Sequence, residues 1–268
     1  MFAEQYVGGA ELSLQAIIDA TPKDKNITKI NSSSVTEQMI DSNKNATWIF
    51  GNIAHLKDDA IKYISQSGVK YHFIEFDYKF CEYRNPELYK FLEDEECDYA
   101  STEKASLIVD FVNNSQKTHF MSEEQKQIYI KNFSNLEVSK LFVLSSVFDD
   151  TFFNNIETLQ GAEKTEKWLV FGSRSWVKGA TQSEKWCQEN NLDYEVINDL
   201  PYEEMLRKLA TSKGICFKPT GLDTCPRYVI EAKLLGCELE LNDNVQHVDE
   251  EWFSTSDNQK TIEYLKNR

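Results

Sequence analysis

The amino-acid sequence predicts an α/β fold made of two Rossmann-like halves with a cleft between them. Short apolar runs alternate along the chain with amphipathic helical stretches, which is typical of parallel sheets built from strand–helix–strand units. The polar stretch from Phe148 to Lys167 shows no clear period and predicts a linker between two such series. With 268 residues, the chain is long enough to give each half its own core.

The first series of elements precedes this linker. Its expected strands are Ile27–Ile30, Thr47–Phe50, Tyr71–Glu75, Thr118–Met121 and Leu141–Leu144. Its expected helices lie at about 11–20, 55–66, 86–94, 103–114 and 122–132. We therefore expect residues 1–150 to form the first domain.

The second series follows the linker. Its expected strands are Trp168–Phe171, Tyr194–Ile197, Ile215–Phe217 and Cys237–Leu241. Its expected helices lie at 179–190, 202–211 and 226–235, with a last helix at Asn258–Arg268. We therefore expect residues 151–250 to form the second domain and residues 251–268 to close the chain with a helix.

Composition narrows the classes of function. A hydrophobic content of 41% with 12% aromatic residues is that of a globular protein. The net charge of −15 argues against a broad nucleic-acid surface, because phosphate binding needs clustered Lys and Arg. No stretch approaches the roughly 20 apolar residues that span a bilayer, and the N-terminus lacks the regions of a signal peptide. We expect a cytoplasmic protein that binds no nucleic acid and does not span a membrane.

The six cysteines do not predict a metal site. They stand at 81, 97, 187, 216, 225 and 237, without a Cys-x-x-Cys pair and without a His at ligand spacing. Cys216 and Cys237 fall in apolar strand patterns and are expected to be buried thiols. Cys225 lies at the start of an expected helix, where a thiolate would be stabilised. Since no His is near it in sequence, its backbone N–H is the more plausible contributor.

The run Pro219–Ala232 carries the most information about function. It is a strand exit, a glycine turn and a helix start, and the first N–H groups of a helix can bind an anion. Asp223 and Glu231 could accept hydrogen bonds from a polyol such as ribose or hexose, while Arg227 meets phosphate. The alternative is structural: Asp223 caps the helix and Arg227 is a solvated charge.

Two further segments have the same character. Trp168–Gly179 is a strand, a glycine turn and a Lys–Gly pair opening a helix, so that Lys178 could meet a diphosphate as a point charge. A solvated lysine at a helix start is the alternative. Gly8 and Gly9 enter a helix and would let the backbone approach a bound group closely, although a plain glycine turn also explains them.

These segments together resemble retaining glycosyltransferases of the GT-B type, family 4 and its relatives. Pro219–Ala232 resembles the acid-x7-Glu signature of that family, with Asp223 as the first acid and Pro226 where Gly is usual. The resemblance implies that Asp223 contacts the transferred sugar and that Glu231 binds the ribose of the nucleotide. It also implies a donor site that includes Thr224, Cys225 and Arg227.

The other two segments resemble further parts of the same family. Trp168–Gly179 is similar to its Gly-Arg-x-x-x-x-Lys-Gly donor loop, with Ser173 in the place of the Arg and Arg174 one residue late. Gly8 and Gly9 match the Gly-Gly-Ala-Glu segment that faces the donor phosphates, and the family's first strand is shortened or absent before them. The resemblance places all of these residues, with Lys178, in the donor site.

The stretch Glu75–Arg84 resembles the family's His-Asp-x-x-x-x-Cys segment, with Phe76 in the place of the His. Asp77, Lys79 and Arg84 are the polar candidates there for binding the acceptor. Three other residues have plainer interpretations. His72 and His119 lie in or beside expected strands and are expected core residues, and Asn52 lines the cleft or forms a turn.

The resemblance implies transfer of a sugar from a nucleotide-diphosphate sugar to a hydroxyl of a glycan, a lipid-linked or another acceptor, with retention. The catalytic candidates for this transfer are Asp223, Lys178 and Glu231. The resemblance implies neither a cofactor nor a metal. It also implies that the closing helix packs on the first domain. One alternative is a nucleotide-sugar-binding protein without transfer activity. Another is a different Rossmann-type enzyme, a dehydrogenase or a sugar epimerase; against the dehydrogenase, no Gly-x-Gly-x-x-Gly follows a first strand.

Overall fold

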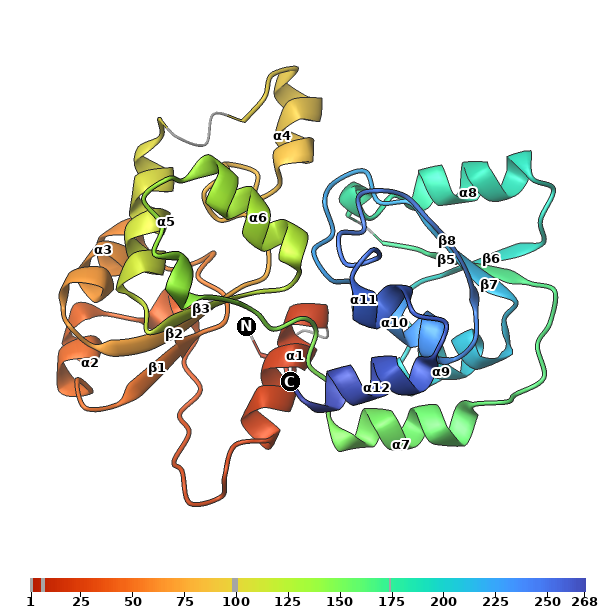
Figure 1. Ribbon diagram of the computed structural model, residues 1–268, viewed down its shortest axis with the longest axis horizontal. Helices are drawn as coiled ribbons and strands as arrows, with labels where there is room; N and C mark the ends of the chain where they lie inside the picture. Colours follow the sequence, from red (N-terminus) through yellow and green to blue (C-terminus); the bar gives the residue numbers. More distant parts are fainter. Residues whose placement is uncertain (1, 6–7, 98–100, 174) are drawn as a thin grey trace. The chain divides into compact units, whose positions relative to one another are not determined.

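The computed structural model describes residues 2–5, 8–97, 101–173 and 175–268. The chain divides into two compact units, Met1–Val147 (unit 1) and Phe148–Arg268 (unit 2). Each unit contains a four-stranded sheet in which all neighbouring strands are parallel, flanked by helices (Figure 1). The α/β class and the Rossmann-like character of both halves are therefore confirmed.

The sheet of unit 1 has the order β1-β2-β3-β4. Its strands are β1 (Thr47–Phe50), β2 (Lys70–Glu75), β3 (Lys117–Phe120) and β4 (Leu141–Val143). The helices are α1 (Gly9–Asp19), α2 (Glu37–Ser42), α3 (Asp58–Gln66), α4 (Pro86–Glu93), α5 (Glu103–Asn114) and α6 (Glu123–Asn132). All four strands and every helix except the short α2 were predicted from the apolar pattern.

An aromatic cluster holds α5 against the sheet of unit 1. The ring of Phe111 lies 5.5 Å from Phe50, 4.7 Å from Tyr71 and 5.2 Å from Phe73, measured between centroids. The hydroxyl of Tyr71 donates a hydrogen bond of 2.6 Å to the carbonyl of Phe111. Strands β1 and β2 are thus tied to one helix, because aromatic rings bury much apolar surface.

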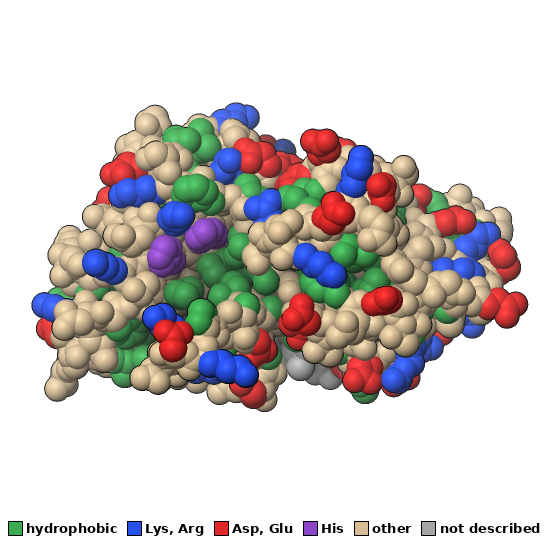
Figure 2. Space-filling model, turned by 60° about the horizontal axis from the view of Figure 1, so that its bottom comes forward, with side chains coloured by type: hydrophobic (Ala, Val, Ile, Leu, Met, Phe, Trp, Pro, Cys, Tyr) green, Lys and Arg blue, Asp and Glu red, His purple; other side chains and the backbone are tan. Residues whose placement is uncertain are grey.

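Another row of residues on the same sheet is open to solvent. The side chains of Ile49 and Phe142 are 54% and 39% exposed, and the rings of His72 and His119 lie 6.2 Å apart. Figure 2 shows histidine side chains next to each other at the surface, among hydrophobic ones. Both histidines are half-buried, so the expectation that they are core residues was wrong. Burial lowers the pKa of each, that of His119 to about 4.

The expected strand Ile27–Ile30 does not form. These residues have no regular secondary structure, and Ile27 is 46% exposed. The ammonium of Lys29 instead donates a hydrogen bond of 2.7 Å to Gln15 of α1. Four residues rich in β-branched side chains satisfy a strand pattern locally, but a strand also needs a partner with which to pair.

The sheet of unit 2 has the order β6-β5-β7-β8. Its strands are β5 (Trp168–Phe171), β6 (Tyr194–Ile197), β7 (Gly214–Phe217) and β8 (Glu238–Leu241). Its helices are α7 (Asp150–Leu159), α8 (Ala180–Glu189), α9 (Tyr202–Thr211), α10 (Arg227–Leu234), α11 (Glu251–Ser254) and α12 (Asn258–Lys266). Within the described ranges of both units, every helix is too short or too polar to cross a membrane.

The predicted linker is wrong, because half of it is the helix α7. The carboxylate of Asp149 caps this helix by accepting a hydrogen bond of 2.8 Å from the N–H of Phe152. Phe152, Phe153 and Ile156 are buried at helical spacing. Because Asp, Asn and Thr are frequent in this stretch, its few apolar residues at helical spacing did not stand out in the sequence. Unit 2 begins at Phe148, directly after unit 1.

The last helix packs within unit 2. The ring of Tyr264 stacks on that of Trp252 in α11, with centroids 4.6 Å apart. The hydroxyl of Thr261 donates a hydrogen bond of 2.7 Å to the carbonyl of Trp252. Helix α12 also contacts α10. That it packs on the first domain stays a prediction.

Candidate functional site

Three loops are joined at the carboxyl edge of the sheet of unit 2. They follow β5, β7 and β8, which are neighbours in the sheet. The carbonyl of Val177 in the first loop accepts a hydrogen bond of 2.9 Å from the N–H of Thr220 in the second. The N–H of Asp223 donates a bond of 2.7 Å to the carbonyl of Asn244 in the third. Ligands of open α/β sheets bind at this edge, beyond the carboxyl ends of the strands.

Two of the predicted catalytic residues meet here. The ammonium of Lys178 lies 2.6 Å from the carboxylate of Asp223, and their side chains are 37% and 11% exposed. Asp223 is not the helix cap, since the residue in that position is Pro226, which has no side-chain cap. The structural alternative for Asp223 is therefore wrong. The pair is partly open to solvent, so a ligand can reach the lysine.

A glycine fixes the position of Lys178. Gly179 has a φ of +67°, in the left-handed region, and a Cβ added to it would lie 1.7 Å from the carbonyl oxygen of Lys218. The chain therefore passes too close to the loop after β7 for any side chain at this position. The Lys–Gly order in the sequence reflects this close approach.

We expect Gly179→Ala to lower the free energy of unfolding by at least about 3 kcal/mol, through the strained φ and the clash together. Gly161→Ala is the matched control, because Gly161 also has a positive φ, of +80°, but its Cβ would meet nothing within 4 Å. The control should lose about 1–2 kcal/mol. Urea unfolding measures both, and equal losses would contradict the steric explanation.

Glu231 lies in a buried network of unit 2. Its carboxylate accepts a hydrogen bond of 2.7 Å from the hydroxyl of Tyr202 and lies 3.5 Å from Nε of Arg227. The guanidinium of Arg227 stands 3.9 Å from the ring centroid of Phe148. Both charged side chains are buried, so Arg227 is not a solvated charge. Burial raises the pKa of Glu231, against the lowering effect of Arg227.

The remaining donor candidates of unit 2 surround this region. Thr224 and Cys225 are buried and stand before the first residue of α10. Ser173 is half-buried, and its hydroxyl accepts a hydrogen bond of 3.1 Å from the N–H of Ser175. Arg174 lies outside the described residues.

Gly8 and Gly9 belong to unit 1. Gly8 is the N-cap residue of α1 in an extended conformation, and Gly9 is its first helical residue. Residues 2–5 and 8, which the structure describes before α1, form no strand. Asn52, also in unit 1, accepts a hydrogen bond of 2.9 Å from the N–H of Ala54, which is a turn role.

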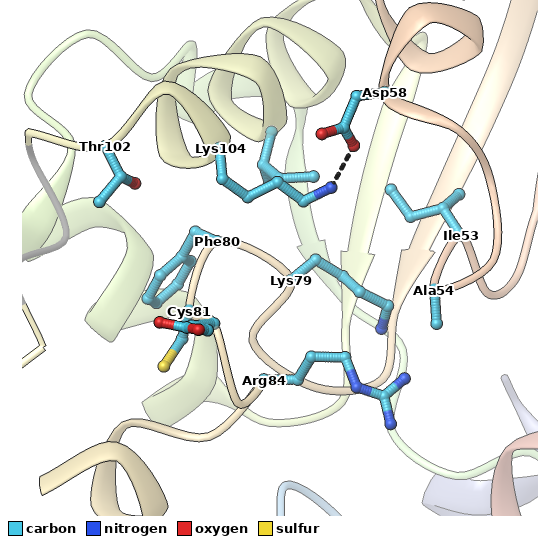
Figure 3. A pocket seen from close by; sticks show the side chains of 11 residues that line it. Ile53, Ala54, Asp58, Lys79, Phe80, Cys81, Arg84, Thr102 and Lys104 are labelled. Atoms are coloured by element: carbon cyan, nitrogen blue, oxygen red, sulfur yellow. Dashed lines mark hydrogen bonds and ion pairs between the residues drawn. The ribbon is translucent and has the colours of Figure 1, made fainter. Parts of the chain in front are cut away.

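Unit 1 contains a pocket of about 480 Å³ that includes two of the three acceptor candidates. Lys79 and Arg84 come from the loop after β2, and Lys104 comes from the first turn of α5 (Figure 3). Lys104 is paired with Asp58 of α3 at 2.5 Å. The apolar part of the lining consists of Ile53, Ala54, Phe80, Cys81 and Ile108. The pocket thus combines cationic groups with an apolar wall, and the acids Asp58 and Glu82 line it as well.

A buried ionic cluster supports this pocket. The ammonium of Lys79 lies 3.1 Å from the carboxylate of Glu75 and also pairs with Asp77. The carboxylate of Asp77 also lies 3.6 Å from the guanidinium of Arg84. Asp77 does not line the pocket itself but holds two of the cations that do. The hydroxyl of Tyr129 donates a hydrogen bond of 2.8 Å to the other oxygen of Glu75. Burial is the largest cause that raises the pKa of Glu75, to about 7.

This pKa predicts a pH-dependent stability. An unfolded chain releases the Glu75 proton near pH 4.5, whereas the folded chain holds it until about pH 7. The contribution of protonated Glu75 to the free energy of unfolding is therefore complete below pH 4.5, and it is lost as the pH rises through 7. We expect the unfolding free energy of the wild type, relative to Glu75→Gln, to fall by about 3 kcal/mol over this window.

The measurement is urea unfolding of both proteins between pH 4.5 and 8. Asp110→Asn, which removes an exposed acid of α5, controls for the loss of a charge. A difference between wild type and Glu75→Gln that does not change with pH would contradict the raised pKa.

The sequence interpretation missed Glu75, Tyr129, Lys104 and Tyr202. The sequence did contain a sign of Glu75. It is the last residue of a strand that is otherwise rich in Tyr, Phe and Ile, and an acid in that position lies at the carboxyl edge of the sheet, where ligands bind. Tyr202 and Lys104 occupy the first turns of helices, a place at which a polar side chain gives no distinctive pattern.

No protein-family model matches the chain, and no curated protein matches its sequence. In the part of the chain that the structure describes, no group of three or more His, Cys, Asp and Glu side chains is placed to hold a metal ion.

Proposed function

We propose that the protein is a glycosyltransferase that moves a sugar from a nucleotide-diphosphate sugar to an acceptor hydroxyl, with retention. The observation that carries the proposal is the Lys178–Asp223 ion pair, at 2.6 Å, in the loops at the carboxyl edge of the sheet. This is the edge at which open α/β sheets bind nucleotides. Its two members are also the residues that resemble the donor lysine and first acid of GT-B transferases. The cleft between two domains, which that arrangement requires, stays a prediction.

In the proposed reaction the donor separates this pair. Lys178 moves to the diphosphate, where negative charge grows as the bond to the anomeric carbon breaks. Asp223 is then free to accept hydrogen bonds from the sugar hydroxyls. In the ligand-free protein each charge satisfies the other, so neither is left unpaired.

Glu231 has a supporting place in this scheme. Its carboxylate holds Tyr202 at 2.7 Å and lies 3.5 Å from Arg227, and these contacts fix the start of α10. The resemblance assigns the ribose hydroxyls to Glu231. We propose that the network as a whole forms the ribose end of the donor site.

On the acceptor side we propose the pocket of unit 1. Three cationic side chains, Lys79, Arg84 and Lys104, line it beside two acids, in a chain whose net charge is −15. Each of the three is paired with a carboxylate, so an anionic acceptor would have to take the place of these partners. The first turn of α5 adds the positive end of a helix dipole. We propose that the acceptor carries a negatively charged group, such as a phosphate or carboxylate, near the hydroxyl that receives the sugar.

The test is a panel of nucleotide sugars, followed by thermal shift and by nucleotide release together. One donor should raise the melting temperature, because a ligand that binds the folded state stabilises it. Release of nucleotide should increase when anionic sugars or sugar phosphates are added as acceptors. The absence of any shift across the panel would overturn the donor site.

A nucleotide-sugar-binding protein without transfer activity is the second candidate. It is favoured by Phe76, which stands where the family has a His near the reacting sugar, and by Ser173 in the place of an Arg. A donor that stabilises the protein without nucleotide release, with or without the acceptor panel, would identify this function.

A further inference from the structure

Two buried thiols lie beside the pocket of unit 1. The sulfur atoms of Cys81 and Cys97 are 3.3 Å apart, and neither cysteine is in a disulfide. A disulfide holds its sulfurs at about 2.05 Å, so the pair is little more than an ångström from bonding distance. Cys81 is 2% exposed and lines the pocket (Figure 3), so the pocket is the side from which a small reagent can approach the pair.

The chain between the two cysteines is already folded back on itself. Helix α4 ends at Glu93, and its C-cap residue Asp94 has a φ of +54°, which turns the chain. Lys90 pairs with Glu96, and the hydroxyl of Tyr83 donates a hydrogen bond to Glu93. Contacts other than those of the sulfurs therefore bring the returning segment to Cys81, and a disulfide would require little rearrangement.

We propose that Cys81 and Cys97 form a reversible disulfide by exchange with a low-molecular-weight disulfide such as oxidised glutathione. The thiolate of Cys81, reached through the pocket, attacks one sulfur of glutathione disulfide and releases one glutathione. Cys97 then displaces the second glutathione from the mixed disulfide. One S–S bond breaks and one forms, the two protein thiols are oxidised, and their protons end on the two released glutathione thiols.

The disulfide would fix one wall of the pocket. It closes the loop that carries Arg84 and α4, and a cross-link across a loop of this size restricts local opening. Arg84 is one of the cations that we assign to the pocket, and its own φ of +54° shows that the loop holds it in the left-handed region. Oxidation would therefore act on the binding wall without touching unit 2.

The first test maps the bond. The full chain is incubated with oxidised glutathione, alkylated, digested and analysed by mass spectrometry. We expect one cross-linked peptide joining Cys81 to Cys97, with the loss of two hydrogens and full reversal by dithiothreitol. Cys97→Ser should instead keep one glutathione on Cys81, and the control Cys237→Ser should retain the cross-link. Complete alkylation of both thiols, or linkage of either to another cysteine, would overturn the proposal.

The second test measures how far the disulfide restricts opening of the loop between the two cysteines. Hydrogen exchange of the amides between the two cysteines should slow on the order of tenfold or more in the oxidised protein, while unit 2 stays unchanged. A disulfide that forms without this change would overturn the effect on the pocket. The cross-linked peptide and the exchange rates are both measured on the wild-type chain, so these two readouts do not depend on the folding of the serine variants.

Discussion

Lys178→Ala is expected to lower the rate of nucleotide release by at least about 100-fold, the usual loss when one group that stabilises a developing charge is removed. The same variant should lose the thermal shift given by the donor. The reason is that Lys218, in the neighbouring loop after β7, is held by Glu240 at 2.6 Å and does not replace the ammonium of Lys178. Initial rates at several donor concentrations measure the effect.

A matched control exists in the same unit. Lys213 lies at the opposite edge of the sheet, directly before β7, and pairs with Glu166 at 2.7 Å. Its side chain is 35% exposed, against 37% for Lys178. Lys213→Ala removes an equal charge from a similar ion pair and should keep full activity. Equal losses in the two variants would show that net charge, and not the site, controls donor binding.

The folding pattern was predictable where local and tertiary preferences agree. Trp168–Phe171 is a continuous apolar run that can be buried on both faces, and it forms β5 with the predicted bounds. Ile27–Ile30 has β-branched residues as well, yet no strand of the described sheet pairs with it. The helix α7 shows the opposite case, since its buried face of Phe152, Phe153 and Ile156 outweighs polar neighbours that resemble a linker.

The residues of the candidate site were also predictable only where a local sequence pattern marks them. The Lys178 and Asp223 motifs could be recognised because each is a strand, a tight turn and a helix start within a few residues. Their ion pair joins residues 45 positions apart, which the motifs alone do not show. The contact of Tyr129 with Glu75 spans 54 positions and leaves no local pattern. Such pairs follow from the strand order, and the strand order was not determined by the sequence pattern.

Glu231→Ala is expected to lower the free energy of unfolding by about 3–5 kcal/mol, because it leaves the buried guanidinium of Arg227 without its carboxylate. Glu203→Ala is the matched control. Glu203 pairs with Arg207 at the same helical spacing and 3.2 Å, but both side chains are exposed, so the control should lose under about 0.5 kcal/mol. Urea unfolding measures both variants.

The double variant Arg227→Met with Glu231→Leu separates structure from function. Apolar residues of similar volume often replace a buried ion pair at little cost, so this protein should recover most of the stability that Glu231→Ala loses. If Glu231 binds the ribose, the stable double variant must still fail to bind the donor. Donor binding that returns together with stability would show that the network serves the fold alone, and Lys178 and Asp223 would then carry the donor site without it.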